Sequence, residues 1–181
     1  MAKSKGKASS DVLAGSATHL LHRALQIALD YHADAAGDGG LTQRQFAVLA
    51  AAGAAEGLTQ SDLVRATGID RSTLADLVAR MIRKGLLERE RSTVDARANS
   101  VRLSEAGRVA LAAGAGPAAD ADARFLGLLS PKKRETFVKM LASLSEAAAE
   151  PPAARRAKAE KPAKSDKKKK KKIRKATAKA A

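Results

Sequence analysis

The segment from residue 69 to residue 85, IDRSTLADLVARMIRKG, constrains the fold of this chain more than any other. Its apolar residues recur at i, i+3, i+4, i+7 and i+8, which places them on one side of an α-helix. They are Leu74, Leu77, Val78, Met81 and Ile82. Asp70 can cap this helix by accepting from N–H groups of the first turn, and Gly85 can end it in a left-handed conformation. The segment therefore predicts a firmly bounded helix with one face against a core.

The opposite side of this predicted helix carries small polar and basic residues, with Ser72 and Asp76 towards its N-terminus and Thr73 and Arg80 at its edge. Arg71, at the first helical position, lies nearer the apolar side. Such side chains at an exposed helix N-terminus suit the reading of base edges in the major groove of duplex DNA. Ser72, Thr73 and Arg80 are candidate base readers, whereas Arg71 is expected to reach a phosphate. An ordinary amphipathic surface helix is the alternative, and the flanking segments favour the DNA-binding interpretation.

Asp76 fits this interpretation least easily, because an acid that faces DNA repels phosphate. It can accept a hydrogen bond from the amino group of a cytosine. It can equally pair with Arg80 at i+4 on the same helix, and we favour that pair.

A second, shorter helix is predicted directly before the first. Thr59 is its cap, Asp62 is a capping-box partner weaker than the usual Glu or Gln, and the helix is expected to end at Thr67–Gly68. Two helices joined by a short turn that contains glycine form a helix-turn-helix. Thr59, Gln60 and Ser61 offer hydroxyl, amide and free N–H groups at the start of the short helix, which suit a phosphate.

The segments on either side complete a mainly helical domain with a small β-hairpin. A long helix is predicted from Asp11 to about Ala33, and another follows from the capping box of Thr42 and Gln45. After Gly85 the pattern changes to alternation, with charged residues over 86–91 and with polar residues over 100–103, and polar, turn-forming residues lie between. This pattern predicts a β-hairpin, the wing of a winged helix.

Two more helices are predicted after the hairpin. Ser104 caps a long helix that continues to Leu128, and Gly114, Gly116 and Pro117 are expected to bend or split it near its middle. Pro131 occupies the favoured first position of the last helix.

Positive charge is concentrated at the two ends of the chain. The chain has 34 Lys and Arg against 19 Asp and Glu, a formal net charge of +15, whereas residues 11–150 contain 17 of each kind. Residues 1–10 are therefore predicted to be a disordered basic N-terminus, residues 11–150 the folded domain, and residues 151–181 a disordered tail rich in Lys, Ala and Pro. The tail includes six consecutive lysines expected to contact DNA without sequence preference: Lys167, Lys168, Lys169, Lys170, Lys171 and Lys172.

Several classes of function are excluded or disfavoured by what the sequence lacks. There is no cysteine, which excludes disulfides and thiolate metal sites within this chain. No run approaches the ~18 apolar residues of a membrane span, and residues 1–10 lack the apolar core of a signal peptide. The chain contains no phosphate loop, dinucleotide fingerprint or hydrolase motif. We therefore expect a cytoplasmic protein with no enzymatic activity, no cofactor and no membrane partner.

The three histidines raise the question of a metal site or a pH sensor. His19 and His22 are three residues apart on the first predicted helix, and His32 follows on the same helix. No cysteine or tight carboxylate cluster completes a metal site, so structural or surface roles are favoured.

The motifs around the hairpin resemble those of the MarR family of transcriptional regulators, over about residues 11–150. The family pattern of D-x-R followed by V-x-L-T-x-x-G is matched by Asp95-Ala96-Arg97 and by residues 101–107, VRLSEAG. Residues 81–89 also fit the family's junction from recognition helix to strand. Three positions depart from the pattern: Ser104 replaces the usual threonine, Ala96 a frequent arginine, and Val94 a frequent proline. The lysine-rich tail, which is similar to histone H1 tails, lies outside the family's usual domain.

The resemblance implies a winged helix-turn-helix homodimer that dimerises through its N- and C-terminal helices. It implies sequence-specific binding to a pseudo-palindromic operator in double-stranded DNA, commonly with repression of nearby genes. It also implies a small-molecule effector that binds between the dimerisation and DNA-binding regions and releases the DNA.

The wing residues of the resemblance are Arg91, Asp95 and Arg97. Arg97 is expected to enter a minor groove, where narrow A-tracts concentrate negative potential, and Asp95 to hold the loop or orient the guanidinium. The alternative is a local surface ion pair worth about 0–1 kcal/mol.

Two functions remain open on the sequence. The first is a ligand-responsive transcriptional regulator, most often a repressor. The second is a nucleoid-associated architectural protein that compacts DNA through its tail. The composition of the tail also fits RNA or acidic membrane lipid.

Overall fold

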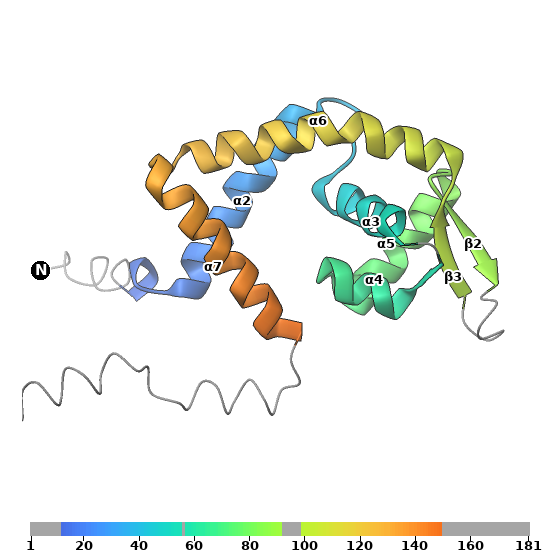
Figure 1. The fold of residues 1–181 in the computed structure, drawn as a ribbon, viewed down its shortest axis with the longest axis horizontal. Coiled ribbons are helices and arrows are strands. Elements are labelled where there is room, and N and C mark those ends of the chain that lie inside the picture. Colours follow the sequence, from blue (N-terminus) through green and yellow to red (C-terminus); the bar gives the residue numbers. More distant parts are fainter. Residues whose placement is uncertain (1–11, 56, 92–98, 150–181) are drawn as a thin grey trace, which may run out of the picture. The chain divides into compact units, whose positions relative to one another are not determined.

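The computed structural model of the chain describes residues 12–55, 57–91 and 99–149. It divides into two compact units, one that ends at Pro131 and one that begins at Lys132 (Figure 1). Among its described residues, the first unit contains the helices α2 Ala17–Ala36, α3 Gln43–Ala54, α4 Gln60–Thr67, α5 Arg71–Arg83 and α6 Glu105–Gly127. Its strands are β1 Leu58–Thr59, β2 Leu87–Arg91 and β3 Asn99–Leu103, and the chain continues into α7 Pro131–Ala149. The predicted fold class, mainly α with a β-hairpin wing, is confirmed.

The sheet is antiparallel with the order β1-β3-β2. The predicted hairpin of β2 and β3 is present, with Leu87 opposite Leu103 and Arg91 opposite Asn99. The third strand, β1, was not expected. It consists of two residues, and Leu58 pairs with Val101. A strand this short has no alternating pattern, so only its pairing with β3 reveals it.

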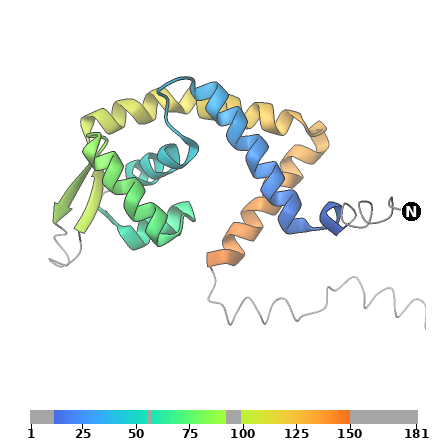
Figure 2. The ribbon, with the colours of Figure 1, turned by 180° about the vertical axis from the view of Figure 1, so that it is seen from behind.

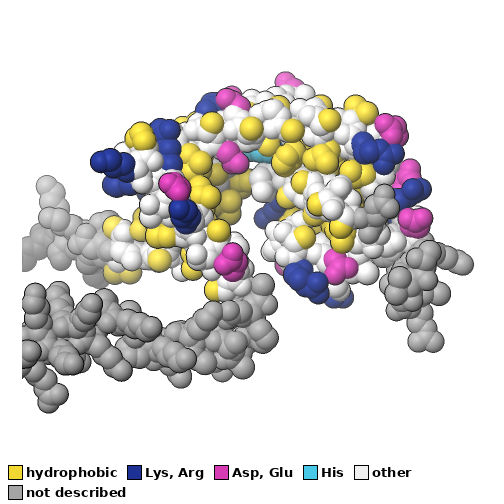
Figure 3. All heavy atoms as spheres, viewed as in Figure 1, with side chains coloured by type: hydrophobic (Ala, Val, Ile, Leu, Met, Phe, Trp, Pro, Cys, Tyr) yellow, Lys and Arg dark blue, Asp and Glu magenta, His cyan; other side chains and the backbone are white. Residues whose placement is uncertain are grey.

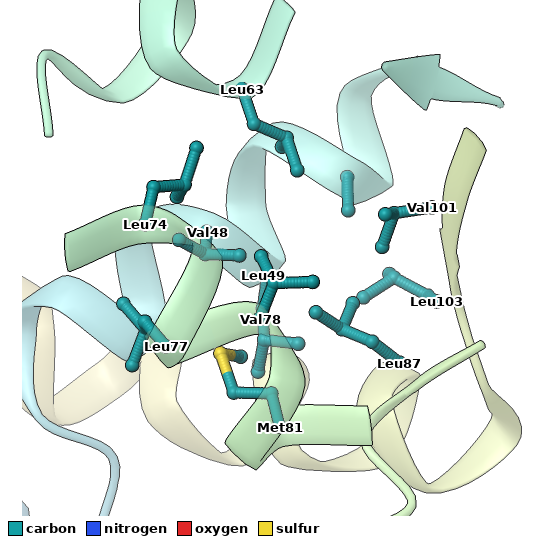
Figure 4. Close-up of a cluster of buried hydrophobic side chains, with 11 residues drawn as sticks. Val48, Leu49, Leu63, Leu74, Leu77, Val78, Met81, Leu87, Val101 and Leu103 are labelled. Atoms are coloured by element: carbon teal, nitrogen blue, oxygen red, sulfur yellow. The ribbon is translucent and has the colours of Figure 1, made fainter. Parts of the chain in front are cut away.

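A single apolar cluster holds α3, α4, α5 and the sheet together (Figure 4). Leu74 and Met81 of α5 are fully buried, and Leu77 and Val78 are 5% exposed. The apolar stripe predicted for this helix therefore faces the core, with Ile82 partly buried at its edge. Other buried members come from α3, α4 and the strands: Val48, Leu49, Ala52, Leu63, Leu87, Val101 and Leu103.

Helices α2 and α6 lie side by side, as the two opposite views show (Figures 1 and 2). Arg124 of α6 forms an ion pair with Asp34 of α2 at 2.7 Å, and its guanidinium lies 4.8 Å from the ring centre of Tyr31. This pair of helices buries few side chains, and apolar residues reach the surface along α6 (Figure 3). Four large apolar side chains of α2 are exposed: Leu20, Leu21, Leu25 and Ile27.

Two predicted long helices differ in part from the structure. The first is interrupted rather than continuous from Asp11: residues 12–14 are helical, and α2 begins at Ala17 because Ser16 adopts extended backbone angles and its side chain accepts from the N–H of His19. The helix that follows the wing was expected to bend or split near its middle, and it does not split, since α6 continues through Pro117 for 23 residues. A Cβ on Gly114 would lie 3.2 Å from Leu41 and from Phe46, so glycine there serves close packing rather than a break. Packing of α6 on α2 and α3 offsets the cost of a proline inside a helix.

The last predicted helix is present as α7 and begins at Pro131 as expected. Its large apolar residues are only partly covered. Phe137 and Leu141 are half-buried, whereas Val138 and Leu144 are exposed.

Candidate nucleic-acid interface

The start of α4 is fixed by a reciprocal capping box. The N–H of Asp62 donates to Thr59 Oγ1 at 3.2 Å, and the N–H of Thr59 donates to Asp62 Oδ2 at 3.1 Å. Asp62 therefore serves fully as the capping partner that the sequence predicted. The hydroxyl and backbone N–H of Thr59, with Arg65 nearby, hold the pKa of Asp62 below its ordinary value. Helix α4 ends as predicted at Thr67, and Gly68 follows with φ +69°.

Asp70 fixes the start of α5, as the sequence predicted. Its Oδ1 accepts from the N–H of Thr73 at 2.9 Å and from the hydroxyl of Ser72 at 2.7 Å. Hydrogen bonds from Thr73 and then Ser72 hold the pKa of Asp70 well below its ordinary value. The carboxylate therefore stays charged and locks the first turn of the helix, where the positive end of the helix dipole also favours it.

The predicted reading face of α5 is open to solvent. Ser72, Asp76 and Arg80 are exposed, and Thr73 is half-buried at the edge of the face. The favoured pairing of Asp76 with Arg80 is wrong, because no ion pair of the described residues joins these two side chains. An exposed i,i+4 pair is worth only about 0.3–0.5 kcal/mol, too little to hold two mobile side chains together.

The two helices of the helix-turn-helix meet at their N-termini. Arg71 donates a hydrogen bond to the hydroxyl of Ser61 at 2.9 Å, which places a guanidinium beside the start of α4. Thr59 and Gln60 are half-buried there and Ser61 is exposed. The structure thus brings the candidate phosphate contacts of the short helix together with Arg71 of α5.

The end of α5 is tied to the start of α6. Gly85 adopts φ +71°, as predicted for the residue that ends the helix. The hydroxyl of Ser104 donates to the carbonyl of Gly85, and Ser104 Oγ accepts from the N–H of Gly107 at 2.9 Å. A Cβ on Gly107 would lie 2.0 Å from the carbonyl oxygen of Leu86. The serine and the glycine of the segment VRLSEAG are therefore both required by contacts with this turn.

The wing is described only at its base. Arg91 is the last residue of β2, whereas Asp95, Arg97 and the six lysines of the tail lie outside the described residues. On the strands, Arg102 forms ion pairs with Glu88 at 2.9 Å and with Glu90 at 3.8 Å.

Arg89 is a candidate that the sequence reasoning missed. It is exposed, and it lines a crevice of about 100 Å³ together with Gln60 of α4 and Ala75 of α5. The sequence did not single out Arg89, because it lies among Glu88, Glu90 and Arg91 in a strand of mixed charge. The alternation of side chains along a strand could have identified it, since it puts Arg89 on the same side as Leu87.

A larger cavity of about 560 Å³ lies between α2, α3, α6 and the end of α5. His32 lies at its wall, buried, with Nε2 3.0 Å from the carbonyl oxygen of Leu41 and its ring 6.4 Å from that of Phe46. Lys84 and Gln45 add polar groups, and Leu86 adds an apolar one. His32 is thus a packed, hydrogen-bonded residue. No group of three metal-ligating side chains occurs in residues 12–55, 57–91 and 99–149.

Among the described helices, none has the length and apolar character needed to cross a membrane. On the face visible in Figure 3, acidic and basic side chains are interspersed, as expected from the equal numbers of each in residues 11–150.

A capped helix-turn-helix followed by a small antiparallel sheet defines the class of winged-helix DNA-binding proteins. The sequence model described as "MarR family" matches residues 39–98. The transcriptional regulator HosA of Escherichia coli O157:H7 is 37% identical over 101 residues, which cover 56% of this chain and 75% of HosA. The chain belongs to the MarR family of winged-helix transcriptional regulators.

Solved structures agree with this assignment. BpsR of Bordetella bronchiseptica is 30% identical, with a TM-score of 0.65 over 71% of this chain and 97% of BpsR. The repressor CouR of Rhodococcus jostii RHA1 is 27% identical in its DNA complex, with a TM-score of 0.66 over 74% of this chain and 94% of CouR. The relatives are transcriptional regulators, in agreement with the expectation that the chain is not an enzyme.

Proposed function

We propose that this protein is a homodimeric transcriptional repressor that binds a pseudo-palindromic operator in double-stranded DNA. The observation that carries the proposal is the exposed, polar N-terminal half of α5, held rigid by Asp70 and by the buried stripe behind it. CouR, which shares this fold, has been solved on a 23-mer DNA duplex.

Each candidate residue is assigned a proposed contact with DNA. Ser72, Thr73 and Arg80 contact base edges, and Asp76, which has no ion pair with Arg80, accepts from a cytosine amino group. Arg71 contacts phosphate together with three residues at the start of α4: Thr59, Gln60 and Ser61. Arg91, Asp95 and Arg97 form the wing contacts, with Arg97 in a minor groove.

A second copy of the chain is the proposed cover for the apolar face of α2. Leu20, Leu21 and Leu25 are 49–52% exposed. A group of exposed apolar side chains of this kind marks an interaction surface. Helix α7 contributes further exposed apolar residues, Val138, Met140 and Leu144. A two-fold dimer presents two recognition helices to a two-fold operator.

A small aromatic acid is the proposed effector, bound in the cavity beside His32. Lys84 offers a cation for a carboxylate, and Leu41, Phe46 and Leu86 offer apolar walls for a ring. BpsR, which is 30% identical, has its DNA binding regulated by 6-hydroxynicotinic acid.

The tail is proposed to add affinity for DNA of any sequence, in a cytoplasmic, nucleoid-associated protein. Each phosphate neutralised contributes about −0.9 to the slope of log K against log salt. If half of the 14 basic residues after Glu150 engage, removing the tail flattens that slope by roughly six per chain. Parallel salt slopes with and without the tail would leave RNA, membrane lipid or protein as its partner.

Selection of duplexes from a random-sequence pool tests the proposed function. The full-length chain is expected to enrich a two-fold symmetric site with half-site centres about 34 Å apart. Arg80→Ala should cost about 1–3 kcal/mol on that site. Arg102→Ala, on the wing sheet and paired with Glu88, serves as the matched control and should cost little. A pool that shows no enriched sequence contradicts the proposal.

A further inference from the structure

We propose that the turn formed by Lys84, Gly85 and Leu86 transmits occupancy of the cavity to the recognition helix and the wing at once. The proposal rests on the proposed function, because it concerns how a ligand in that cavity changes DNA binding. The coupling depends on the three residues of the turn and on Ser104. Loss of the hydrogen bond from the Ser104 hydroxyl should separate ligand binding from DNA release.

The cavity side of the turn consists of two side chains. Lys84 and Leu86 both line the cavity, on either side of Gly85. They are the points at which an occupant touches the segment between α5 and β2. A ligand whose carboxylate contacts Lys84 and whose ring contacts Leu86 therefore contacts this one turn at two points.

On the α5 side the turn is closed by consecutive backbone hydrogen bonds. The N–H of Lys84 donates to the carbonyl of Arg80 at 3.0 Å, and the N–H of Leu86 donates to that of Met81 at 3.0 Å. The N–H of Gly85 donates to the carbonyl of Ile82 at 2.9 Å, which completes a Schellman motif. These hydrogen bonds join the turn to the last residues of the recognition helix, where Met81 is fully buried in the core.

On the wing side the turn is held by Ser104. Its N–H donates to the carbonyl of Leu86 at 3.3 Å, and its hydroxyl donates to the carbonyl of Gly85. Ser104 follows directly after β3, and β2 begins at Leu87, which is 1% exposed. Gly107 leaves no space behind Leu86, because a Cβ there would lie 2.0 Å from its carbonyl oxygen. The turn therefore cannot shift without moving both strands of the wing.

These contacts make the turn the shared support of two DNA-reading elements. A ligand changes an equilibrium only through interactions that differ between the two states. The ligand's contacts with Lys84 and Leu86 are the interactions that differ between the two states. The hydrogen bond from the Ser104 hydroxyl transmits the resulting change in the turn to the wing. Removing the hydroxyl should leave the cavity intact and reduce the coupling.

The absence of cysteine allows an occupant to be installed without knowing the natural ligand. Ala113 lines the cavity and is exposed, so the thiol of Ala113→Cys is available for reaction. Dithiobis(nitrobenzoic acid) forms a mixed disulfide with it and releases one thionitrobenzoate, which leaves an aromatic carboxylate in the cavity. Dithiodipyridine installs an uncharged ring by the same exchange. Ala112→Cys, exposed on α6 but not at the cavity, is the matched labelling control.

We expect the nitrobenzoate label on Ala113→Cys to weaken binding to the selected operator by about tenfold or more, a typical coupling between two sites. The label on Ala112→Cys should change it little, and the uncharged ring should have a smaller effect. Adding Ser104→Ala should reduce the tenfold loss to less than about threefold. Ser104→Thr, which keeps the hydroxyl, should retain the loss.

Ser16→Ala is the matched control for the lost helix cap, because Ser16 caps α2 and does not contact the turn. When Ser16→Ala is added to the labelled Ala113→Cys protein, the full tenfold loss of operator affinity should remain. An equal loss in the Ser104→Ala protein, or no loss on labelling Ala113→Cys, would overturn the coupling while leaving operator recognition intact. If no operator is selected, the proposed function fails. Amide hydrogen exchange at Lys84, Gly85 and Leu86 then tests the turn by itself, and exchange unchanged by the label would overturn it.

Discussion

The lobe of α3, α4, α5 and the sheet differs from the pair of helices α2 and α6 in how completely each hides its apolar residues. In the lobe, the large apolar side chains of one cluster are buried almost entirely (Figure 4). In α2 only His32 is buried, and four large apolar residues are exposed. The lobe thus buries its large apolar side chains within one chain, whereas α2 leaves four of its own exposed.

Because of this difference, substitutions in the two regions should have different effects. Substitutions in the lobe should act on folding, because a cavity or a buried charge there has no alternative partner. Substitutions on the exposed face of α2 should act on assembly, because in the proposed dimer a second chain buries that face.

The largest effect is expected for Leu77→Asp in the lobe. The side chain is 5% exposed, so the new carboxylate loses its hydration unless it becomes protonated. We expect a loss of stability of about 3–5 kcal/mol, measured by thermal or urea unfolding. A soluble variant with the melting temperature of the wild type would show that the stripe of α5 does not face the core.

A smaller effect on folding, with a clear effect on assembly, is expected for Leu21→Asp in α2. Leu21 is 52% exposed within one chain, so the charge remains hydrated in a monomer and is desolvated only in a dimer. The mass of the full-length chain in solution at micromolar concentration should shift from dimer to monomer. Arg23→Asp, a charge change at a residue that is already polar and exposed on the same helix, is the control. A monomeric wild type would refute the dimer.

Arg97→Ala should weaken operator binding by about 1–3 kcal/mol and leave the melting temperature unchanged. The expectation comes from the D-x-R pattern of the wing, because Arg97 lies outside the described residues. Operator affinity and thermal unfolding of the same preparation provide the check. If neither quantity changes, Arg97 is only a surface charge.

The smallest effect is expected for the pH dependence that Asp70 imparts. The pKa of its carboxyl is lowered in the folded chain from 3.8 by hydrogen bonds from Thr73 and Ser72. The associated stability is therefore present above pH 3.8 and is lost as pH falls below it. Asp70→Asn keeps a good cap but cannot titrate, so its unfolding midpoint should change less between pH 5 and pH ~2.5 than that of the wild type. Identical profiles would exclude Asp70 as a source of acid sensitivity.

The sequence predicted best the features that depend on residues within one turn of a helix. The caps at Thr42, Thr59, Asp70 and Ser104 were all found, because each joins a side chain to a backbone group three residues away. Most of the recognition face followed from the phase of the apolar stripe.

The sequence failed where distant segments meet. Strand β1 exists only through its partner β3, and Gly114, which sequence alone marks as a helix breaker, makes room for Leu41 and Phe46. The helical spacing of Asp76 and Arg80 allowed an ion pair, but spacing alone does not hold exposed side chains together. The cavity beside His32 was implied only by the family resemblance, since three separate helices and the turn after α5 contribute to it.

Mapping the DNA bound in cells by the full-length chain, and by a chain that ends at Glu150, tests the central claim most directly. The recognition helix and wing should place both forms in sharp peaks at a shared two-fold symmetric sequence. The full-length chain should add a broad background, because its tail contacts phosphates irrespective of sequence. Broad coverage without peaks for the full-length chain, and no retained DNA for the shortened one, would contradict the account and favour an architectural protein that compacts DNA through its tail.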